Sequence, residues 1–241
     1  MNTLFQTIFY QPILNLLVFL YNTFGDLGLA IIFLTLIVKI ILFPLSKKSI
    51  KSQKSLQDLQ PKIDELKIKH KDDKQAQSVA LMALYKENKV NPFSSCLPLI
   101  IQLPFFFAIF RVFKDGFAQN HLELLYPFVN NPEIINTITF GFLDLSEKNV
   151  ILAVLAGLAQ FWQGKMMHVK KPEIKTDGSK DENMLSVMNK QMLYVMPVVT
   201  IFIGLSFPAG LTLYWFLTTL FTVGQQKLVF SKNKSSIKIL K

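Results

Sequence analysis

The 241-residue sequence has little of what soluble enzymes and disulfide-stabilised domains depend on. It contains one cysteine, Cys96, so it can form neither an intrachain disulfide nor a metal site with two cysteine ligands. Its three histidines, His70, His121 and His168, lie too far apart for metal-ligand spacing, and no G-x-x-x-x-G-K nucleotide loop is present. These absences exclude the common thiol, zinc and phosphate-loop chemistries, and we expect no metal and no small-molecule cofactor.

Acidic residues are also scarce. The chain has 16 Asp and Glu against 26 Lys and Arg, a net charge of +10, and no Asp or Glu lies inside its long apolar runs. In contrast, 51% of the residues are hydrophobic, 22 are Phe, and the mean hydropathy is +0.35. This is the composition of a membrane protein. The first residues lack a basic region and an A-x-A site, so we do not expect a cleaved signal peptide.

The longest apolar run begins at Leu27 and ends at Pro44, and a cluster of lysines follows it. As a helix it is long enough to cross the ~30 Å hydrocarbon core of a bilayer. One charge, Lys39, interrupts it. The function of the protein depends on why a cation lies in this helix.

Apolar runs and polar intervals together predict an all-α membrane protein with five spans. The expected segments are an interfacial helix (4–24), span 1 (27–45), a cytosolic helical hairpin (46–92), span 2 (95–113), an external region (114–148), span 3 (149–167), a cytosolic loop (168–189), span 4 (190–206), span 5 (209–229) and a basic cytosolic tail (230–241).

The first segment allows two interpretations. Its apolar residues recur at helical spacing, whereas Gln11, Asn15 and Asn22 recur on another face. This pattern favours a helix that lies in the membrane interface, and a sixth span is the alternative.

The interval 46–92 holds eleven Lys, six Asp or Glu and no Gly. Two stretches of amphipathic periodicity flank the polar break His70–Lys74, which indicates a charged helical hairpin outside the membrane. Pro61 either starts or kinks the first of these helices.

The basic residues set the orientation. The hairpin, residues 165–190 and residues 227–241 hold 22 of the 26 Lys and Arg. Because cytoplasmic segments carry the excess of Lys and Arg, five spans with the N-terminus outside and the C-terminus inside place all three in the cytosol. We therefore expect a multi-pass protein of a bacterial inner membrane.

Lys39 has two interpretations. It lies about 7–8 Å from the cytosolic end of its span, so its side chain can snorkel to the headgroups. Alternatively, it faces a water-filled cavity, as intramembrane charges commonly do. Thr35 lies one turn earlier on the same face. Gln102, Gln160 and Gln163 either line that cavity or form hydrogen bonds between helices.

Aromatic and basic residues near the C-terminus are equally ambiguous. Tyr214 and Trp215 lie near the outer end of span 5, where they either belong to an interfacial aromatic belt or contact a ligand in the cavity. The lysine-rich tail suits anionic lipid headgroups and ribosomal RNA phosphates alike.

Four stretches together resemble the YidC–Oxa–Alb family of membrane protein insertases over nearly the whole chain. They are IVKIILFPLS (37–46), LQPKIDELKIKHKDD (59–73), LYKENKVNPFSSCLPLIIQLPFFFAIFRV (84–112) and FPAGLTLYW (207–215). Their order, with a charged hairpin between the first two spans, is specific.

The resemblance implies five spans around a hydrophilic groove that is open to the cytosol and to lipid and closed on the outer side. It implies insertion of hydrophobic segments without nucleotide hydrolysis by a minimal bacterial member of the family. Lys39, Thr35, Tyr214 and Trp215 match family groove or substrate-contact positions, and either Gln160 or Gln163 matches the polar position of the family's third span. The family usually has Arg where this chain has Lys39, and a lysine loses its charge more readily when it is desolvated.

The resulting hypothesis is an insertase and chaperone whose partners are nascent membrane proteins and the lipid bilayer. The ribosome, through the hairpin and the tail, and a Sec translocon are further candidate partners. Two rival functions are a small transporter or anion channel that uses Lys39 as its binding charge, and a purely structural subunit. We see no inverted repeat and no acidic proton relay within a span, which disfavours a transporter.

Overall fold

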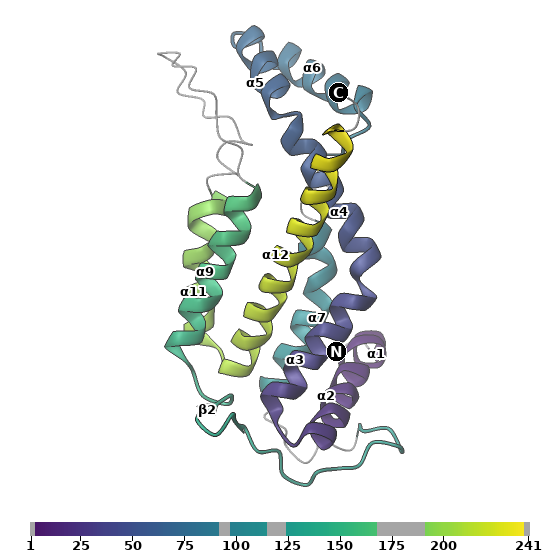
Figure 1. Cartoon of the computed structure of the whole chain (residues 1–241), viewed down its shortest axis with the longest axis vertical. Coiled ribbons are helices and arrows are strands. Elements are labelled where there is room, and N and C mark those ends of the chain that lie inside the picture. The colour runs from purple at the N-terminus through teal and green to yellow at the C-terminus, as the bar shows by residue number, and fades with distance from the viewer. Residues whose placement is uncertain (1–2, 92–96, 115–123, 168–190, 239–241) are drawn as a thin grey trace.

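The structure is a computed structural model that describes residues 3–91, 97–114, 124–167 and 191–238, and these residues are mostly helical (Figure 1). Its helices are α1 (Thr3–Phe5), a π-helix (Gln6–Tyr10), α2 (Gln11–Phe24), α3 (Leu27–Ile41), α4 (Phe43–Asp58), α5 (Gln60–Lys69), α6 (Lys74–Glu87), α7 (Leu97–Lys114), α9 (Val150–Met167), a second π-helix (Gln191–Val195), α11 (Met196–Ser206) and α12 (Ala209–Lys238). Two short strands, β1 (Ile138–Thr139) and β2 (Leu143–Asp144), pair antiparallel.

The long helix α12 joins two groups of helices. On one side it packs against α9 and α11, and on the other it packs against α3, α4 and α7 (Figure 1). The main apolar core lies between α2, α3, α7 and the first half of α12, and Leu14, Leu34, Ile109 and Leu211 are among its fully buried members. Where these helices face water, burial of apolar surface stabilises their association. Where they lie in lipid, close packing of their side chains stabilises it instead.

Two adjacent residues explain the tight turn between α2 and α3. Gly25 ends α2 with a φ of +69°, a left-handed conformation that glycine adopts without a steric penalty. Asp26 then caps α3, because its carboxylate accepts a hydrogen bond from the Leu29 backbone N–H at 2.9 Å. The rings of Phe24 and Phe33 stack across the turn with centroids 4.4 Å apart.

The segment that contains β1 and β2 ties the start of α3 to the start of α12. Asp26 also accepts hydrogen bonds from the Thr139 hydroxyl and, at 2.9 Å, from the Phe140 backbone N–H. Beyond β2, the carbonyls of Leu145 and Glu147 accept hydrogen bonds from the first two N–H groups of α12, at 2.9 and 2.7 Å. Those N–H groups have no partner within their own helix, so the segment satisfies them.

The polar face of α2 forms hydrogen bonds with the segment that follows residue 123. Asn15 is 3% exposed, and its amide donates to the Leu124 carbonyl at 3.1 Å and accepts from the Tyr126 N–H at 2.5 Å. Gln11 also donates to Leu124, and Asn22 donates to the Asn130 carbonyl at 2.7 Å. The interfacial helix was expected from these same side chains, but their partners lie in the segment that follows residue 123.

The charged interval consists of three helices, because Pro61 starts a new one. Helix α4 ends at Asp58, and α5 begins at Gln60 with Pro61 in its first turn, where the missing N–H is not needed. His70 ends α5, and Asp73 caps α6 by accepting from the N–H groups of Gln75 and Ala76 at 3.0 and 2.9 Å. Helices α5 and α6 share a small apolar cluster of their own, built on Leu59, Ile63, Leu84 and Tyr85.

Several element boundaries differ from those expected. Span 1 was expected to reach residue 45, but α3 ends at Ile41, and α4 leaves it at an angle of 68°. The tail was expected to be separate from residue 230 onward, but α12 continues to Lys238 because no glycine or proline interrupts it after Gly224. Span 4 begins with a π-helix before Met196.

By length and composition alone, one described helix, Val150–Met167, is apolar enough to cross a membrane, or up to two if the bent pair α3–α4 counts as one span. A shorter apolar helix covers Leu193–Ser206. The expected cytosolic loop 168–189, the start of span 2 and the last residues of the tail lie outside the described residues.

The first prediction concerns Asp26, which caps α3 and holds β1. We expect Asp26→Ala to lower the free energy of unfolding by about 1–2 kcal/mol, the usual value of a helix N-cap with additional bonds. Thermal unfolding in detergent measures it. Asp144→Ala is the matched control, because the Asp144 carboxylate caps no described helix and binds Ser146, Thr137 and the Glu147 backbone within its own segment. Equal effects of the two substitutions would contradict the prediction.

The same carboxylate gives a pH dependence. Burial acts to raise the pKa of Asp26, but the hydrogen bonds from Thr139, Leu29 and Phe140 outweigh it and lower that pKa below 3.8. A lowered pKa means that the charged form stabilises the fold above about pH 4 and that this contribution is lost as the pH falls through the lowered pKa. The stability difference between the native chain and Asp26→Asn should therefore shrink below pH 4.

The second prediction concerns the α5–α6 pair. Its buried residues form a cluster that is separate from the main core, and Val79 and Met82 are 66% and 64% exposed. We expect amide hydrogens of α5 and α6 to exchange with solvent well before those of α3 and of Ala209–Val223 in α12. Hydrogen exchange with mass spectrometry on the full chain measures this order, and equal protection would contradict it.

Candidate functional site

Lys39 lies in the last turn of α3 and faces α12. Its side chain is only 9% exposed, and its ammonium donates a hydrogen bond to the Thr222 hydroxyl at 2.9 Å. The Thr222 hydroxyl in turn donates to the Thr218 carbonyl of its own helix at 2.8 Å. Within the described part of the chain Lys39 forms no ion pair, since the pairs found there join Lys54 to Asp58 and Lys71 to Asp72.

A buried ammonium with one hydroxyl acceptor is poorly compensated. The group has three donors, and removal of a charge from water is unfavourable by several kcal/mol unless hydrogen bonds or counter-charges replace the water. The snorkelling interpretation requires an exposed ammonium, and the direction of the side chain toward Thr222 disfavours it. Lys39 is therefore a buried cation whose donors are only partly used by the described residues.

Thr35 lies one turn before Lys39 on the same helix and is completely buried. Its hydroxyl donates to the Ile31 carbonyl at 2.7 Å, so it satisfies its hydrogen-bond donor within α3. The structure places Thr35 beside Lys39 along the face that packs toward α12, but it shows no contact between the two side chains.

Gln102 and Tyr214 form a second polar contact between helices. The Gln102 amide of α7 donates to the Tyr214 hydroxyl of α12, and Tyr214 is 1% exposed. A buried tyrosine with an amide partner is not a member of an exposed aromatic belt. Trp215, its neighbour, is half-buried and meets the ring of Phe106 edge-on, with centroids 5.2 Å apart.

The two glutamines of α9 lie elsewhere. Gln160 and Gln163 are partly buried on a helix that packs against α11 and α12, and neither forms a hydrogen bond with Lys39. Beside them, Trp162 is 44% exposed and carries the Lys227 ammonium 4.6 Å from its ring centroid.

A pocket lies between α9, α11 and the start of α12. Its lining includes Ala156, Thr200, Gly204, Phe207 and Trp215. Of the residues expected to form the site, only Trp215 is among the lining residues of this mostly apolar pocket. The pocket is therefore not a cavity around Lys39.

Sequence reasoning missed the face of α12 that Lys39 meets. Tyr214, Thr218, Thr222 and Gln226 follow one another at intervals of four, which places them on one face of the helix. The signal was present, as polar residues at helical spacing in an otherwise apolar run. Gln226 is 2% exposed, and its side-chain oxygen is buried without a partner among the described residues. This face of α12 therefore has an unused hydrogen-bond acceptor about one turn after Thr222.

The arrangement as a whole is a set of polar groups between α3, α7 and α12. Lys39 meets Thr222 toward one end, and Gln102 meets Tyr214 nearer the middle of α7. No group of three His, Cys, Asp or Glu in the described ranges is arranged to hold a metal ion. These side chains can bind anionic or hydrogen-bonding groups.

Known proteins resemble the chain along most of its length. Residues 19–236 match the family model described as 60Kd inner membrane protein. A Fusobacterium nucleatum protein named membrane protein insertase YidC is 34% identical over 227 residues, which cover 92% of this chain and 97% of that protein. A Geotalea daltonii protein of the same name is 38% identical over 227 residues, which cover 93% of this chain but 37% of that protein.

The chain thus spans little more than a third of the length of the Geotalea relative. The crystal structure of an active YidC insertase, with its first transmembrane domain resolved, aligns with a TM-score of 0.61 and 26% identity, over 92% of this chain and 46% of that chain. The chain therefore belongs to the 60Kd inner membrane protein family, the family of the membrane protein insertases named YidC.

Proposed function

We propose that the protein inserts hydrophobic segments of nascent membrane proteins into the bacterial inner membrane and assists their folding, without nucleotide hydrolysis. The observation that carries the proposal is the Lys39 ammonium, which is buried between α3 and α12 and has a hydroxyl, and no carboxylate from the described residues, as its partner. The relatives named insertases support the same function.

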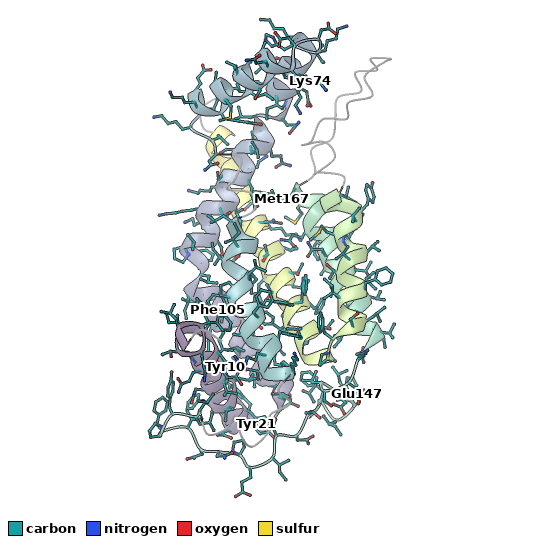
Figure 2. The ribbon with its side chains drawn as sticks, turned by 180° about the vertical axis from the view of Figure 1, so that it is seen from behind. Tyr10, Tyr21, Lys74, Phe105, Glu147 and Met167 are labelled. Atoms are coloured by element: carbon teal, nitrogen blue, oxygen red, sulfur yellow. The ribbon has the colours of Figure 1, made fainter. Side chains whose placement is uncertain are left out.

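The proposed membrane arrangement has five spans, built on α3, α7, α9, α11 and the first part of α12. The N-terminus and the β1–β2 segment lie outside, and the α4–α6 region and the basic C-terminus lie in the cytosol. The distribution of Lys and Arg supports this orientation. Figure 2 is consistent with it, because Lys74 lies at one end of the molecule and Tyr21 and Glu147 lie at the other.

The proposed first step is capture of an acidic residue in the short outer tail of a substrate. The Coulomb attraction between a carboxylate and an ammonium about 4 Å apart is ~4 kcal/mol at an effective dielectric constant of about 20. The hydrogen bond of the ammonium to a neutral hydroxyl is worth about 1.5–3 kcal/mol. A substrate carboxylate therefore replaces the Thr222 hydroxyl as the acceptor of the Lys39 ammonium. When the substrate tail leaves, the ammonium binds the Thr222 hydroxyl again.

The proposed second step is lateral release. Transfer of each large apolar side chain from water to lipid is favourable by about 1.5–3 kcal/mol, so a span of about 20 residues outweighs one ion pair. The groove therefore needs only to lower the barrier for the polar tail, and the bilayer supplies the driving force. Gln102, Tyr214 and Trp215 are proposed to contact the passing segment, together with Gln160 or Gln163 on α9.

The proposed partners of the cytosolic side are the ribosome and a Sec translocon. Helices α5 and α6 expose Lys62, Lys69, Lys74 and Lys86, and the basic C-terminal end of α12 lies near them in Figure 1. Such surfaces attract the phosphates of ribosomal RNA.

The third prediction tests the charge at position 39. Lys39→Arg should support insertion, Lys39→Ala should slow insertion of substrates with acidic tails about tenfold, equivalent to about 1.4 kcal/mol, and Lys39→Glu should block it. Protease protection of the substrate tail in proteoliposomes measures insertion. Lys47→Ala, an exposed lysine of α4, is the control. Undiminished insertion by Lys39→Glu would refute an attractive role for the cation.

The fourth prediction tests the contact of Lys39 with Thr222. Thr222→Val removes the acceptor and should lower the free energy of unfolding by about 1–2 kcal/mol, whereas Thr222→Ser should change it by less than about 0.5 kcal/mol. In a Lys39→Ala background the effect of Thr222→Val should disappear. Thermal unfolding in detergent measures all of these variants.

The control for that cycle is Thr219→Val. Thr219 lies on α12 and is 4% exposed, whereas Thr222 is partly buried, and the Thr219 hydroxyl donates to the Trp215 carbonyl of its own helix at 2.9 Å. An effect of Thr222→Val that persists without Lys39 would show that Thr222 stabilises α12 and does not position the ammonium.

A further inference from the structure

The turn between β1 and β2 contains a bulky residue in an unfavourable backbone conformation. Phe140 and Gly141 have φ values of +53° and +79°, and the Phe142 N–H donates to the Thr139 carbonyl at 3.2 Å across them. Two successive positive φ angles suit Asn-Gly or Gly-Gly, and a phenylalanine at the first position is strained. Strain of this kind persists where the side chain has a use.

That use is not burial in the protein. Ile138, Phe140 and Phe142 are 50%, 47% and 81% exposed, whereas Thr139 and Leu145 of the same segment are completely buried. The three exposed apolar side chains lie close together in sequence at the end of a short hairpin, and we call them the hairpin tip.

The hairpin tip rests on a firmly held backbone. The Thr139 hydroxyl accepts a hydrogen bond from the Gly28 N–H at 3.1 Å and donates to Asp26, and Asp26 also binds the Phe140 N–H. A side-chain Cβ at position 28 would overlap Thr139, so the hairpin lies directly on the start of α3. The apolar face is therefore presented in one orientation.

Charge and position indicate what covers this face. Residues 124–147 contain no Lys or Arg and three acids, Glu133, Asp144 and Glu147, so they do not suit anionic headgroups or nucleic acid. The apolar surface continues into α9, where Val150 and Ile151 are 63% and 71% exposed. Figure 1 places β2 next to this end of α9.

We propose that the hairpin tip inserts into the outer boundary between the headgroups and the hydrocarbon of the bilayer, where aromatic side chains are favoured. This inference rests on the proposed function, because it requires α9 to cross the membrane. Insertion of the hairpin tip attaches the β1–β2 segment to the lipid surface, in addition to its hydrogen bonds with the starts of α3 and α12.

Site-directed spin labelling of the full chain in phosphatidylcholine vesicles tests the inference. In a Cys96→Ser background, nitroxides are attached to Phe142→Cys at the hairpin tip, to Glu147→Cys on the exposed polar side, and to Leu158→Cys, a 59% exposed position in the middle of α9. Their collision rates with oxygen, which concentrates in lipid, and with a water-soluble nickel chelate report the depth of each site.

The expected result is a nitroxide at 142 that collides at least threefold more with oxygen than with the chelate, relative to the nitroxide at 147, together with a still deeper nitroxide at 158. Equal water access at 142 and 147, with 158 in lipid, would overturn the inference and leave the proposed function standing. Low access of both reagents to 142 would also overturn it, because a protein surface would then cover the tip. Water access at 158 would overturn the proposed function itself.

Discussion

One buried ammonium constrains the arrangement of α3 and α12. Lys39 lies at the end of a helix that is otherwise apolar, and a charge in that place needs acceptors. Thr222 is the acceptor that the fold supplies, at 2.9 Å, from a helix 183 residues further along the chain. The face of α12 that carries Thr222 must therefore point toward α3, and this requirement also directs Tyr214, two turns earlier, toward Gln102 of α7.

The contacts between these helices differ greatly at their two ends. At the end where α3 and α12 begin, Asp26, Thr139 and the carbonyls of Leu145 and Glu147 form a continuous set of hydrogen bonds. At the other end, one bond joins Lys39 to Thr222. Since several hydrogen bonds of about 1 kcal/mol each are harder to break together than a single one, separation of α3 from α12 should begin at the Lys39 end. Together with the proposed orientation, this asymmetry supports the proposal of a groove that opens toward the cytosol and stays closed outside.

The sequence predicts some of these features and misses others for identifiable reasons. The helical segments follow from apolar periodicity, and the family membership inferred from four short stretches is confirmed. Lys39 stands out because a charge in an apolar run is rare. Thr222 was missed although it belongs to a row of polar residues at intervals of four, because such a row does not reveal which helix it meets. The role of Asp26 was missed as well, because it depends on hydrogen bonds with the β1–β2 hairpin, more than 100 residues away in sequence.

Other differences come from local alternatives that periodicity does not resolve. Pro61 is compatible with a kink or a helix start, and only the packing of α5 against α6 selects the start. Gln160 and Gln163 lie on a helix that packs against α11 and α12, so their polarity alone did not reveal which neighbours they meet. The polar side chains of α2 looked like an interfacial face because their partners near Leu124 and Asn130 are more than 100 residues distant in sequence.

The presence of lysine rather than arginine at position 39 fits its surroundings. A guanidinium has five donors in a planar fork and requires several acceptors in fixed directions. The face of α12 offers the Thr222 hydroxyl and, one turn further, the unused oxygen of Gln226. Under the proposed function, a compact ammonium on a flexible stem moves between such single acceptors and a substrate carboxylate, and each exchange keeps its charge partly satisfied. Lysine then suits a site that binds its substrate briefly, as the proposed release of a hydrophobic segment into lipid requires.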